Sequence, residues 1–578
     1  MTILEALQAE HPVARLVFQA IQNCHTVTKD GSKLFLLYLR NILVNIQQDI
    51  LQGSFSHNGT NLKLINTSQQ EASTLCVRKH IEHLKREILP RIYKQVIAHC
   101  ELVRRQLRLD RIVCQQGVIK NILKTAMMPH YSVVQCDFYA DLLVSCLPID
   151  DVYRNMSEAL QLTVDNFDHL VIKVPNHPYK DCAVLPMFLI KQRFKYKWEK
   201  LKARKQLKAV VLNCSCFVSE SDEVSDTVKI TESIGIEKLI VCQRSVVEKF
   251  VRSLEHNNID IILCSCTLPN YVVDIFRRNR VSVISNVLED DIELMELVSN
   301  KLNINNLSED IDDVNIIKLS DVNEIIIGGR EYIQLKFEDH TKSLKHLIVC
   351  APTVGLCDQL ALTLHKALNA LKLSFLPIDE FNDNHFNRSE YLQNMGDLDT
   401  RKLSIEDHGC DVIKTTKIFP QVAYLIPDRE VSDTVLTDTD TDDIWQNIAA
   451  IEGGTSFEIL LAHLLKKYSV DCIDTNLSNL CDILEKAMLS VVQKLYENTN
   501  IEPKNKRNFL KIETLLKTKV CSDSLWGLDR RGLPCYLLDK GVLEPMFVKF
   551  HTLNCVLDLL YQLLGINKIV SCKKIKDD

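Results

Sequence analysis

The chain has 578 residues, so it can bury a large core and is long enough to divide into several domains. Its 69 Lys and Arg residues are balanced by 75 Asp and Glu residues, a formal net charge of -6, which gives no basic footprint for nucleic acid. No run approaches the roughly 18 to 20 apolar residues of a membrane span, and the first 20 residues are acidic where a signal peptide is basic, so we expect a cytoplasmic protein.

The first part of the chain carries long helical patterns of apolar residues. The spacing predicts helices over 11–23, 31–50, 72–98 and 100–113. An Asp-Gly turn, Lys29 to Lys33, separates the first two helices. Because a helix N-terminus presents free N–H groups and the positive end of its dipole, this turn suits phosphate, and Asp30 could hold the magnesium that phosphate carries. An ordinary N-cap turn is the alternative.

Alternating strands and helices follow between about 186 and 350. We predict strands over 209–213, 239–241, 259–263 and 281–284, helices over 243–256, 269–278 and 289–301, and two return strands over 329–337 and 344–350. This alternation favours an α/β domain with parallel strands.

Two Cys-x-Cys pairs stand at the ends of strand-like runs in this region. Cys214 with Cys216, and Cys264 with Cys266, each follow four or more apolar residues. Adjacent parallel strands would bring the four thiols together as a zinc site. The alternative is that all four are reduced, buried structural cysteines, as we expect for most of the 21 Cys residues of the chain.

The last third of the chain begins with a predicted helix over 360–372, which contains His365 and Lys366. Residues 373–445 are rich in Asp, Asn and Thr, which predicts a largely disordered insert. Gly453 and Gly454 then precede an apolar helix, and the segment from Gly541 to Lys549 leads into another.

In their order, these segments resemble the group II chaperonins, the CCT and thermosome subunits of the TCP-1/cpn60 family. The resemblance rests on the following motifs: Glu10-His11-Pro12-Val13-Ala14, Asp30-Gly31, the helix around His365, Gly453-Gly454, and Gly541-Val542-Leu543-Glu544-Pro545. It implies an α/β multidomain chaperonin subunit, truncated at its N-terminus. The implied divisions are 1–118 and 446–578 for a helical equatorial domain, 119–185 and 354–372 for a small intermediate domain, 186–353 for an α/β apical domain, and 373–445 for the insert.

The resemblance also implies a degenerate nucleotide site. Its residues would be Asp30, Gly31, Ser32, Gly453, Gly454 and Glu544, with magnesium on Asp30. Lys366 stands where the family has its catalytic Asp, and Lys29 and Lys33 replace a Gly and a Thr of the phosphate loop. Because a protonated Lys has no lone pair, it cannot deprotonate water. We therefore expect no catalytic residue, no effective ATP hydrolysis and no required cofactor, whether or not ATP and magnesium still bind.

Two further segments, Ile3-Leu4-Glu5-Ala6-Leu7 and Phe457-Glu458-Ile459-Leu460, resemble the divergent chaperonin-like proteins linked to Bardet-Biedl syndrome. That resemblance implies a hetero-oligomer with other such proteins and with CCT subunits, in the cytoplasm or at the ciliary base. Its clients would be subunits of the BBSome, the coat complex of ciliary membrane traffic. The alternative is an ATP-driven folding subunit like those of CCT, against which Lys29, Lys33 and Lys366 argue.

Overall fold

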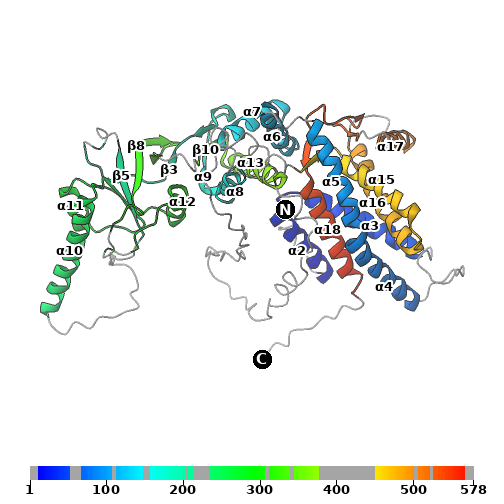
Figure 1. The fold of residues 1–578 in the computed structure, drawn as a ribbon, viewed down its shortest axis with the longest axis horizontal. Helices are drawn as coiled ribbons and strands as arrows, with labels where there is room; N and C mark the ends of the chain where they lie inside the picture. The colour runs from blue at the N-terminus through cyan, green and yellow to red at the C-terminus, as the bar shows by residue number, and fades with distance from the viewer. Residues whose placement is uncertain are drawn as a thin grey trace, which may run out of the picture.

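A helical bundle, a small middle unit and an α/β unit follow one another along the long axis of the molecule (Figure 1). The computed structural model describes residues 11–51, 67–106, 112–147, 156–199, 201, 206–213, 233–305, 307, 311–338, 344–375, 449–499, 506–520 and 525–566. The chain runs from the bundle through the middle unit to the α/β unit and then returns, so the bundle and the middle unit each contain two separate stretches of sequence.

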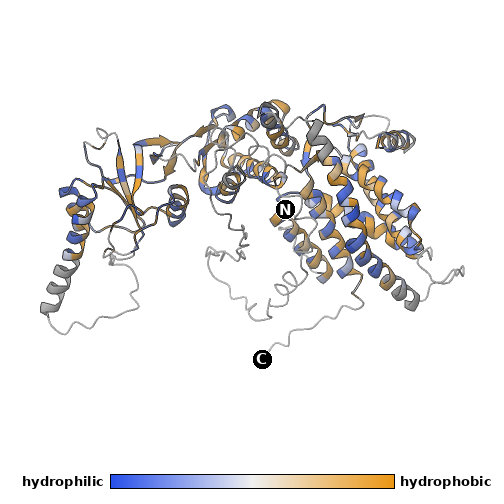
Figure 2. Cartoon of the chain, viewed as in Figure 1, coloured by the Kyte–Doolittle hydropathy of each residue, from blue (hydrophilic) through white to orange (hydrophobic). Residues whose placement is uncertain are grey.

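Both stretches of the bundle consist mainly of amphipathic helices. The first supplies α2 (Pro12–Thr28), α3 (Ser32–Leu51), α4 (Thr67–His83), the π-helical turn η1 (Leu84–Ile88) and α5 (Leu89–Gln106). The second supplies α15 (Ser456–Asp471), α16 (Thr475–Glu497), α17 (Lys506–Val520) and α18 (Met546–Leu563). The apolar faces of these helices, α17 excepted, meet in one core that includes Phe35, Phe457 and Phe550, while α17 packs through Phe509 and Leu516 in a smaller cluster. Figure 2 shows apolar and hydrophilic residues alternating along the helices of the bundle. The predicted helices 11–23, 31–50 and 72–98 are confirmed, whereas 100–113 is not a separate helix, because α5 continues to Gln106.

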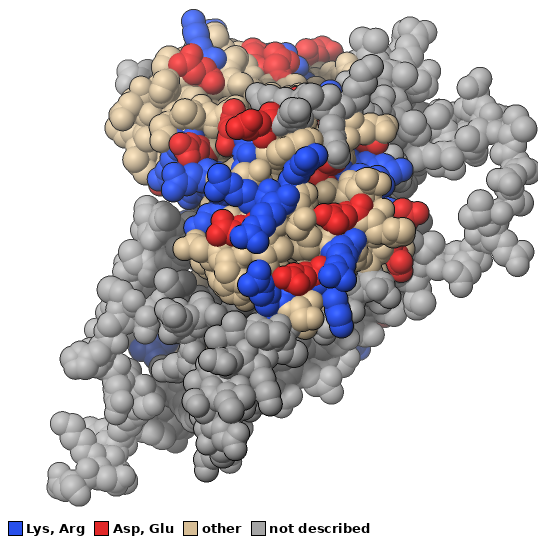
Figure 3. All heavy atoms as spheres, turned by 90° about the vertical axis from the view of Figure 1, so that its left-hand side faces the viewer, with Lys and Arg blue, Asp and Glu red and all other residues tan. Residues whose placement is uncertain are grey.

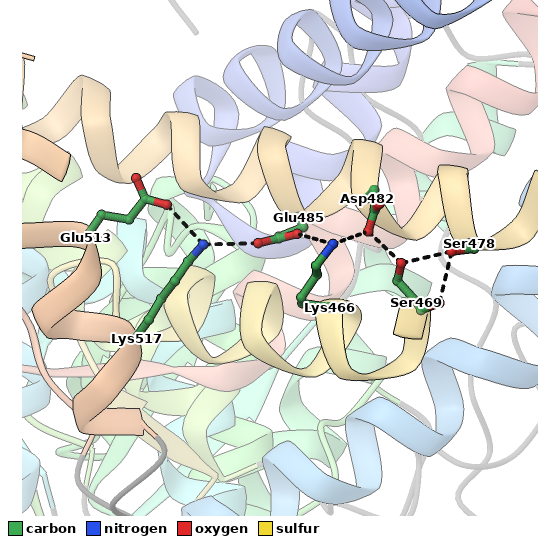
Figure 4. A network of polar contacts seen from close by, with 7 residues as sticks. All are labelled: Lys466, Ser469, Ser478, Asp482, Glu485, Glu513 and Lys517. Atoms are coloured by element: carbon green, nitrogen blue, oxygen red, sulfur yellow. Dashed lines mark hydrogen bonds and ion pairs between the residues drawn. The ribbon is translucent and has the colours of Figure 1, made fainter. Parts of the chain in front are cut away.

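A polar network holds α17 on the outside of the bundle (Figure 4). Lys517 on α17 lies 3.1 Å from Glu485 on α16, and Lys466 on α15 lies 3.0 Å from Asp482 on α16. Ser469 adds a hydrogen bond of 2.6 Å to Asp482. Lys466 also contacts Glu485, and Lys517 also contacts Glu513. The three helices are therefore linked by ion pairs as well as by packing.

The middle unit packs helices on a three-stranded sheet. Its helices are α6 (Ile112–Met127), α7 (Val133–Cys146), α8 (Met156–Asp165), α9 (Phe167–Leu170) and α13 (Val354–Ser374), and its sheet has the order β1 (Val171–Pro175), β10 (His346–Ala351), β2 (Ala183–Leu185), with the short turn η3 (Tyr179–Asp181) before β2. The prediction that 344–350 returns to the α/β sheet is wrong, because β10 pairs with β1 in parallel and with β2 in antiparallel register. Local sequence does not determine which strands pair, and both partners of β10 lie more than 160 residues before it in the chain.

The α/β unit is a seven-stranded mixed sheet with helices on both faces. The strand order is β3 (Phe188–Ile190), β9 (Arg330–Phe337), β8 (Ile317–Ile327), β5 (Leu207–Leu212), β6 (Ile261–Cys264), β7 (Ser282–Ile284), β4 (Phe194–Tyr196). The three central strands β5, β6 and β7 are parallel, as the pattern predicts. Residues 239–241 are not a strand but part of α10 (Ser233–His256), because an apolar run of three residues does not distinguish a strand from a helix.

Successive residues of the central strands belong to two different cores. Ala209 and Val211 pack with α12 (Glu289–Ser299) on one face of the sheet, while Val210 and Leu212 pack with α10 and α11 (Asn270–Arg278) on the other. Figure 3 shows Lys and Arg interspersed with Asp and Glu on the end of the molecule formed by this unit.

The two ends of the predicted insert meet in space. Residues 376–448, which contain most of the segment 373–445, lie outside the described residues. Helix α13 continues to Ser374, two residues past its predicted end, and the Ala449 N–H donates a hydrogen bond of 2.8 Å to the Ser374 carbonyl oxygen. The short strand β11 (Ala450–Glu452) follows at once and pairs with β14 (Leu543–Pro545). Among the described helices, none is long and apolar enough to cross a membrane.

Candidate functional site

Helix α13 of the middle unit brings Lys366 against the turn between α2 and α3. The Lys366 Nζ lies 3.5 Å from Asp30 Oδ1, with the two side chains 36% and 69% exposed. One turn further along α13, the buried Asn369 donates from Nδ2 to the Thr28 carbonyl oxygen at 3.0 Å. The turn is therefore fixed to the middle unit by one hydrogen bond and approached by one cation.

The turn itself has a tightly defined backbone. Lys29 ends α2 in the left-handed conformation (φ 54°), and Gly31 is also left-handed (φ 76°). The Thr28 hydroxyl bonds to the Asp30 carbonyl oxygen at 2.8 Å. A Cβ at Gly31 would lie 2.7 Å from Thr552 Oγ1 on α18, so only glycine lets the turn press against that helix. Ser32 then begins α3, with its hydroxyl 3.1 Å from His25 Nδ1.

Positive charge surrounds Asp30. Burial lowers the pKa of His25, and the charge of Lys366 lowers it further. Burial also lowers the pKa of His130, just after α6, with Lys366 and Lys33 adding to the effect. In both cases the Asp30 carboxylate opposes the shift without reversing it. Two histidines from different elements therefore both lie in the field of Lys366.

The glycine loop lies beside β14. The Gly453 N–H donates to the Val542 carbonyl oxygen at 3.0 Å, and Ile451 is opposite Glu544 in the β11–β14 pair. A Cβ at Gly453 would lie 2.8 Å from Glu544 Oε1. Gly454 is left-handed (φ 59°), and a Cβ there would lie 2.5 Å from the Leu528 carbonyl oxygen.

A buried charge network adjoins this loop. Lys549 Nζ lies 3.0 Å from Glu458 Oε1 and 2.9 Å from Glu544 Oε2, and the Tyr38 hydroxyl donates to Glu458 Oε1 at 2.7 Å. Glu458 is fully buried. Burial alone would lower the pKa of Lys549, but the two carboxylates outweigh burial and raise it. Burial and the neighbouring Glu458 raise the pKa of Tyr38, so the phenol stays a hydrogen-bond donor.

The sequence comparisons agree with this architecture. Residues 1–376 match the TCP-1/cpn60 chaperonin family, which is more than half of the chain. The chain belongs to the TCP-1/cpn60 chaperonin family. The bundle is therefore the equatorial unit of a chaperonin subunit, the middle unit the intermediate one, and the α/β unit the apical one.

Two curated relatives are both described as "BBSome complex assembly protein BBS10". The mouse protein (Mus musculus) is 20% identical over 394 residues, which is 65% of this chain and 53% of that protein. The orangutan protein (Pongo abelii) is 20% identical over 397 residues, 65% of this chain and 52% of that protein. The chain thus spans about half the length of the curated relatives it matches.

A solved chaperonin shares the fold along almost the whole chain. The crystal structure of a group III chaperonin in the open state superposes with a TM-score of 0.59 at 12% identity, covering 98% of this chain and 90% of that one. This likeness supports the chaperonin fold, including the return of the chain through the intermediate unit into the equatorial one.

The structure places the residues expected from the chaperonin motifs in two groups, one at the α2–α3 turn and one beside β14. Asp30 meets Lys366, and Gly31 packs on Thr552 in the second turn of α18. Gly453 meets Glu544 on β14, the strand that directly precedes α18. Sequence reasoning assigned no role to Tyr38, Glu458 or Lys549; the available signal was a charged residue within two otherwise apolar helical runs.

The residues at the turn do not fit a magnesium ion on Asp30. The carboxylate that would bind the cation already faces the Lys366 ammonium, and Lys29 and Lys33 flank it in the sequence. A divalent cation there would add to this positive charge, whereas an anion would be attracted by it.

The structure describes one of the two Cys-x-Cys pairs, Cys264 with Cys266. Strands β5 and β6 are adjacent and parallel, as the zinc hypothesis requires, with Leu212 opposite Cys264. Cys264 Sγ lies 3.3 Å from Cys266 Sγ. Cys214 and Cys216 lie outside the described residues, so the shared site stays a prediction.

Proposed function

We propose that this chain is a chaperonin-like assembly factor that does not hydrolyse ATP and that assists assembly of the BBSome. The observation that carries the proposal is the contact of Lys366 with Asp30 in a chain that shares the chaperonin fold along 98% of its length. Binding is the physical activity that such a frame retains when its hydrolysis site is altered.

The chemical argument concerns the attacking water. Hydrolysis of ATP needs an acceptor that orients the water and takes its proton, and general-base catalysis contributes about 10²- to 10⁴-fold. Lys366 is a donor without a free lone pair, so it supplies neither function. Its ammonium instead lies 3.5 Å from the one carboxylate of the turn, Asp30, and opposes the binding of a magnesium ion there.

The client and the partners are inferred from the relatives. Both curated relatives are described as BBSome assembly proteins, and they match this chain over 65% of its length. We infer that this chain acts in a hetero-oligomer with other chaperonin-like proteins and CCT subunits, in the cytoplasm or at the ciliary base, and contacts BBSome subunits through its apical unit.

The alternative is an ATP-driven folding subunit like those of CCT. Five family positions favour it: Asp30, Gly31, Gly453, Gly454 and Glu544 keep residues that match the family motifs. The two functions differ in their dependence on Asp30. An ATP-driven subunit loses its function when Asp30 is replaced by Ala, whereas the assembly factor proposed here keeps it.

The experiment is complementation of a knockout in ciliated cells of the organism that encodes the chain. Sedimentation separates assembled BBSome from free subunits. We expect assembly to fall in the knockout and to recover with both the wild type and Asp30→Ala. Normal assembly in the knockout contradicts the proposed function, and recovery with the wild type alone favours the ATP-driven alternative.

The apical contact has a matched pair of variants. Tyr271 on α11 and Leu297 on α12 are both 44% exposed, and they lie on helices that cover opposite faces of the apical sheet. We expect Tyr271→Asp to weaken co-purification of BBSome subunits and Leu297→Asp to leave it unchanged. Equal recovery of clients by both variants contradicts a contact through α11.

A further inference from the structure

Three potential metal ligands converge between α2 and α18 of the equatorial unit. Cys24 lies on α2, and His551 and Cys555 lie one turn apart on α18. Cys24 is 1% exposed, His551 is 9% exposed and Cys555 is partly buried. Among the residues that the structure describes, these three form the one group of Cys, His or acidic side chains whose ligand atoms lie close enough together to hold a metal ion.

The spacing of the donor atoms matches a metal centre. The Cys24 Sγ, the His551 ring nitrogen and the Cys555 Sγ all lie within 4.8 Å of one another, and His551 Nε2 lies 3.4 Å from Cys555 Sγ. A tetrahedral zinc ion with bonds of about 2.3 Å to sulfur and 2.0 Å to nitrogen separates such ligand atoms by roughly 3.5 to 3.8 Å. Small rotations of buried side chains are therefore enough to bind the ion.

The chemistry of the donors selects the metal class. Two thiols and one imidazole are soft and borderline ligands that favour Zn²⁺ over the hard cations Mg²⁺ and Ca²⁺. His551 and Cys555 are at i and i+4, so both point to the same side of α18, where Cys24 of α2 faces them. The Thr552 hydroxyl, 3.9 Å from Cys24 Sγ, borders the same space.

We propose that Cys24, His551 and Cys555 bind one Zn²⁺ ion that ties α2 to α18. Binding releases the two thiol protons to solvent and forms two Zn–S bonds and one Zn–N bond, with a water or the Thr552 hydroxyl in the fourth position. The ion closes a loop between residues that are 531 positions apart on the chain, from Cys24 to Cys555. Since Thr552 also contacts the Gly31 turn, zinc would hold in place the part of α18 on which that turn packs.

The probe is Zn²⁺ alone, added to the reduced full-length chain after chelator treatment. The variants Cys24→Ala and Cys555→Ser each remove one ligand. The matched control is Cys481→Ala, which removes a fully buried thiol of the same equatorial core outside the cluster. The chain has 21 Cys residues, so the tight site is read from the difference between variants in zinc stoichiometry and in competition with a chelating dye.

We expect the wild type and Cys481→Ala to bind one more tight Zn²⁺ than Cys24→Ala or Cys555→Ser. Outer partners of zinc ligands already change affinity by about 10- to 100-fold, so loss of a ligand should weaken binding by more than about 100-fold. His551→Cys, which keeps a donor at that position, should retain the site. With Co²⁺ as the probe, the wild type should show a thiolate-to-cobalt charge-transfer band that Cys24→Ala lacks.

Equal zinc stoichiometry and affinity in the wild type, Cys24→Ala and Cys555→Ser would overturn the proposal. A Cys24–Cys555 disulfide in the chain purified under reducing conditions would overturn it as well, because a disulfide removes both thiolates. If Cys24→Ala alone fails to fold by circular dichroism, Cys555→Ser at the partly buried position decides the outcome.

Discussion

Replacing Lys549 by Met tests whether the buried charge network holds the C-terminal helix in the equatorial core. The Lys549 side chain is 13% exposed and pairs with Glu458, which is fully buried, at 3.0 Å. Removing one partner of such a pair leaves a buried charge without compensation, which costs about 3 to 5 kcal/mol. The same substitution at Lys366 removes a pair whose side chains are 36% and 69% exposed, which costs about 0 to 1 kcal/mol.

The expected difference between the two variants is therefore about 3 kcal/mol, a factor of more than 100 in a local unfolding equilibrium. Hydrogen exchange of peptides from α15 and α18 measures that equilibrium within one unit of a multidomain chain. Exchange should rise in Lys549→Met and stay near wild type in Lys366→Met. Adding Glu458→Gln to Lys549→Met should recover part of the loss, because it removes the uncompensated charge.

Equal protection of α15 and α18 in Lys549→Met and Lys366→Met would refute this reasoning. It would mean that Glu458 and Glu544 find other compensation once the ammonium is gone, and that the network does not determine the position of α18.

Three further predictions concern backbone space, the insert and pH. Gly454→Ala should destabilise the equatorial unit by more than about 2 kcal/mol, because φ is positive there and the new Cβ would lie 2.5 Å from the Leu528 carbonyl oxygen. The control Gly355→Ala, where the new Cβ would have no atom within 4 Å, should not, and equal thermal unfolding of the two variants would contradict this reasoning. Replacing residues 376–448 by a short Gly-Ser linker should leave the melting temperature unchanged, since the flanking residues are hydrogen-bonded to one another; a drop of many degrees would show that the segment contributes to the fold. Burial lowers the pKa of His346 from 6.5 to about 4, so the neutral ring contributes up to about 3 kcal/mol of stability, which is complete above pH 6.5 and is lost as the pH falls towards 4. His346→Gln should therefore flatten the pH dependence of hydrogen exchange in β10, and an unchanged slope would be inconsistent with this.

Local patterns in the sequence predict most of the fold. Helices with apolar spacing, such as α2, α3 and α13, and the parallel strands β5, β6 and β7 lie where periodicity indicates them. The errors concern choices that local sequence does not determine. Residues 239–241 continue a helix, and the strand at 344–350 joins a different sheet, because its partners β1 and β2 precede the apical unit in the chain.

The site divides in the same way. The motifs marked Asp30 and Lys366 as positions to compare with the family, but their approach to 3.5 Å depends on how α13 packs against the α2–α3 turn. The contacts of Lys549 with Glu458 and of Cys24 with Cys555 join residues from distant parts of the chain. Tertiary packing alone creates such pairs, so they could not be predicted from spacing.

The most direct measurement for the central claim is phosphate release from ATP by the purified full-length chain, free of other chaperonin subunits. The account predicts that the wild type releases no more phosphate than Asp30→Ala. It also predicts that Lys366→Asp alone does not restore turnover, because Lys29 and Lys33 remain at the turn. Steady turnover by the wild type that Asp30→Ala abolishes would contradict the account.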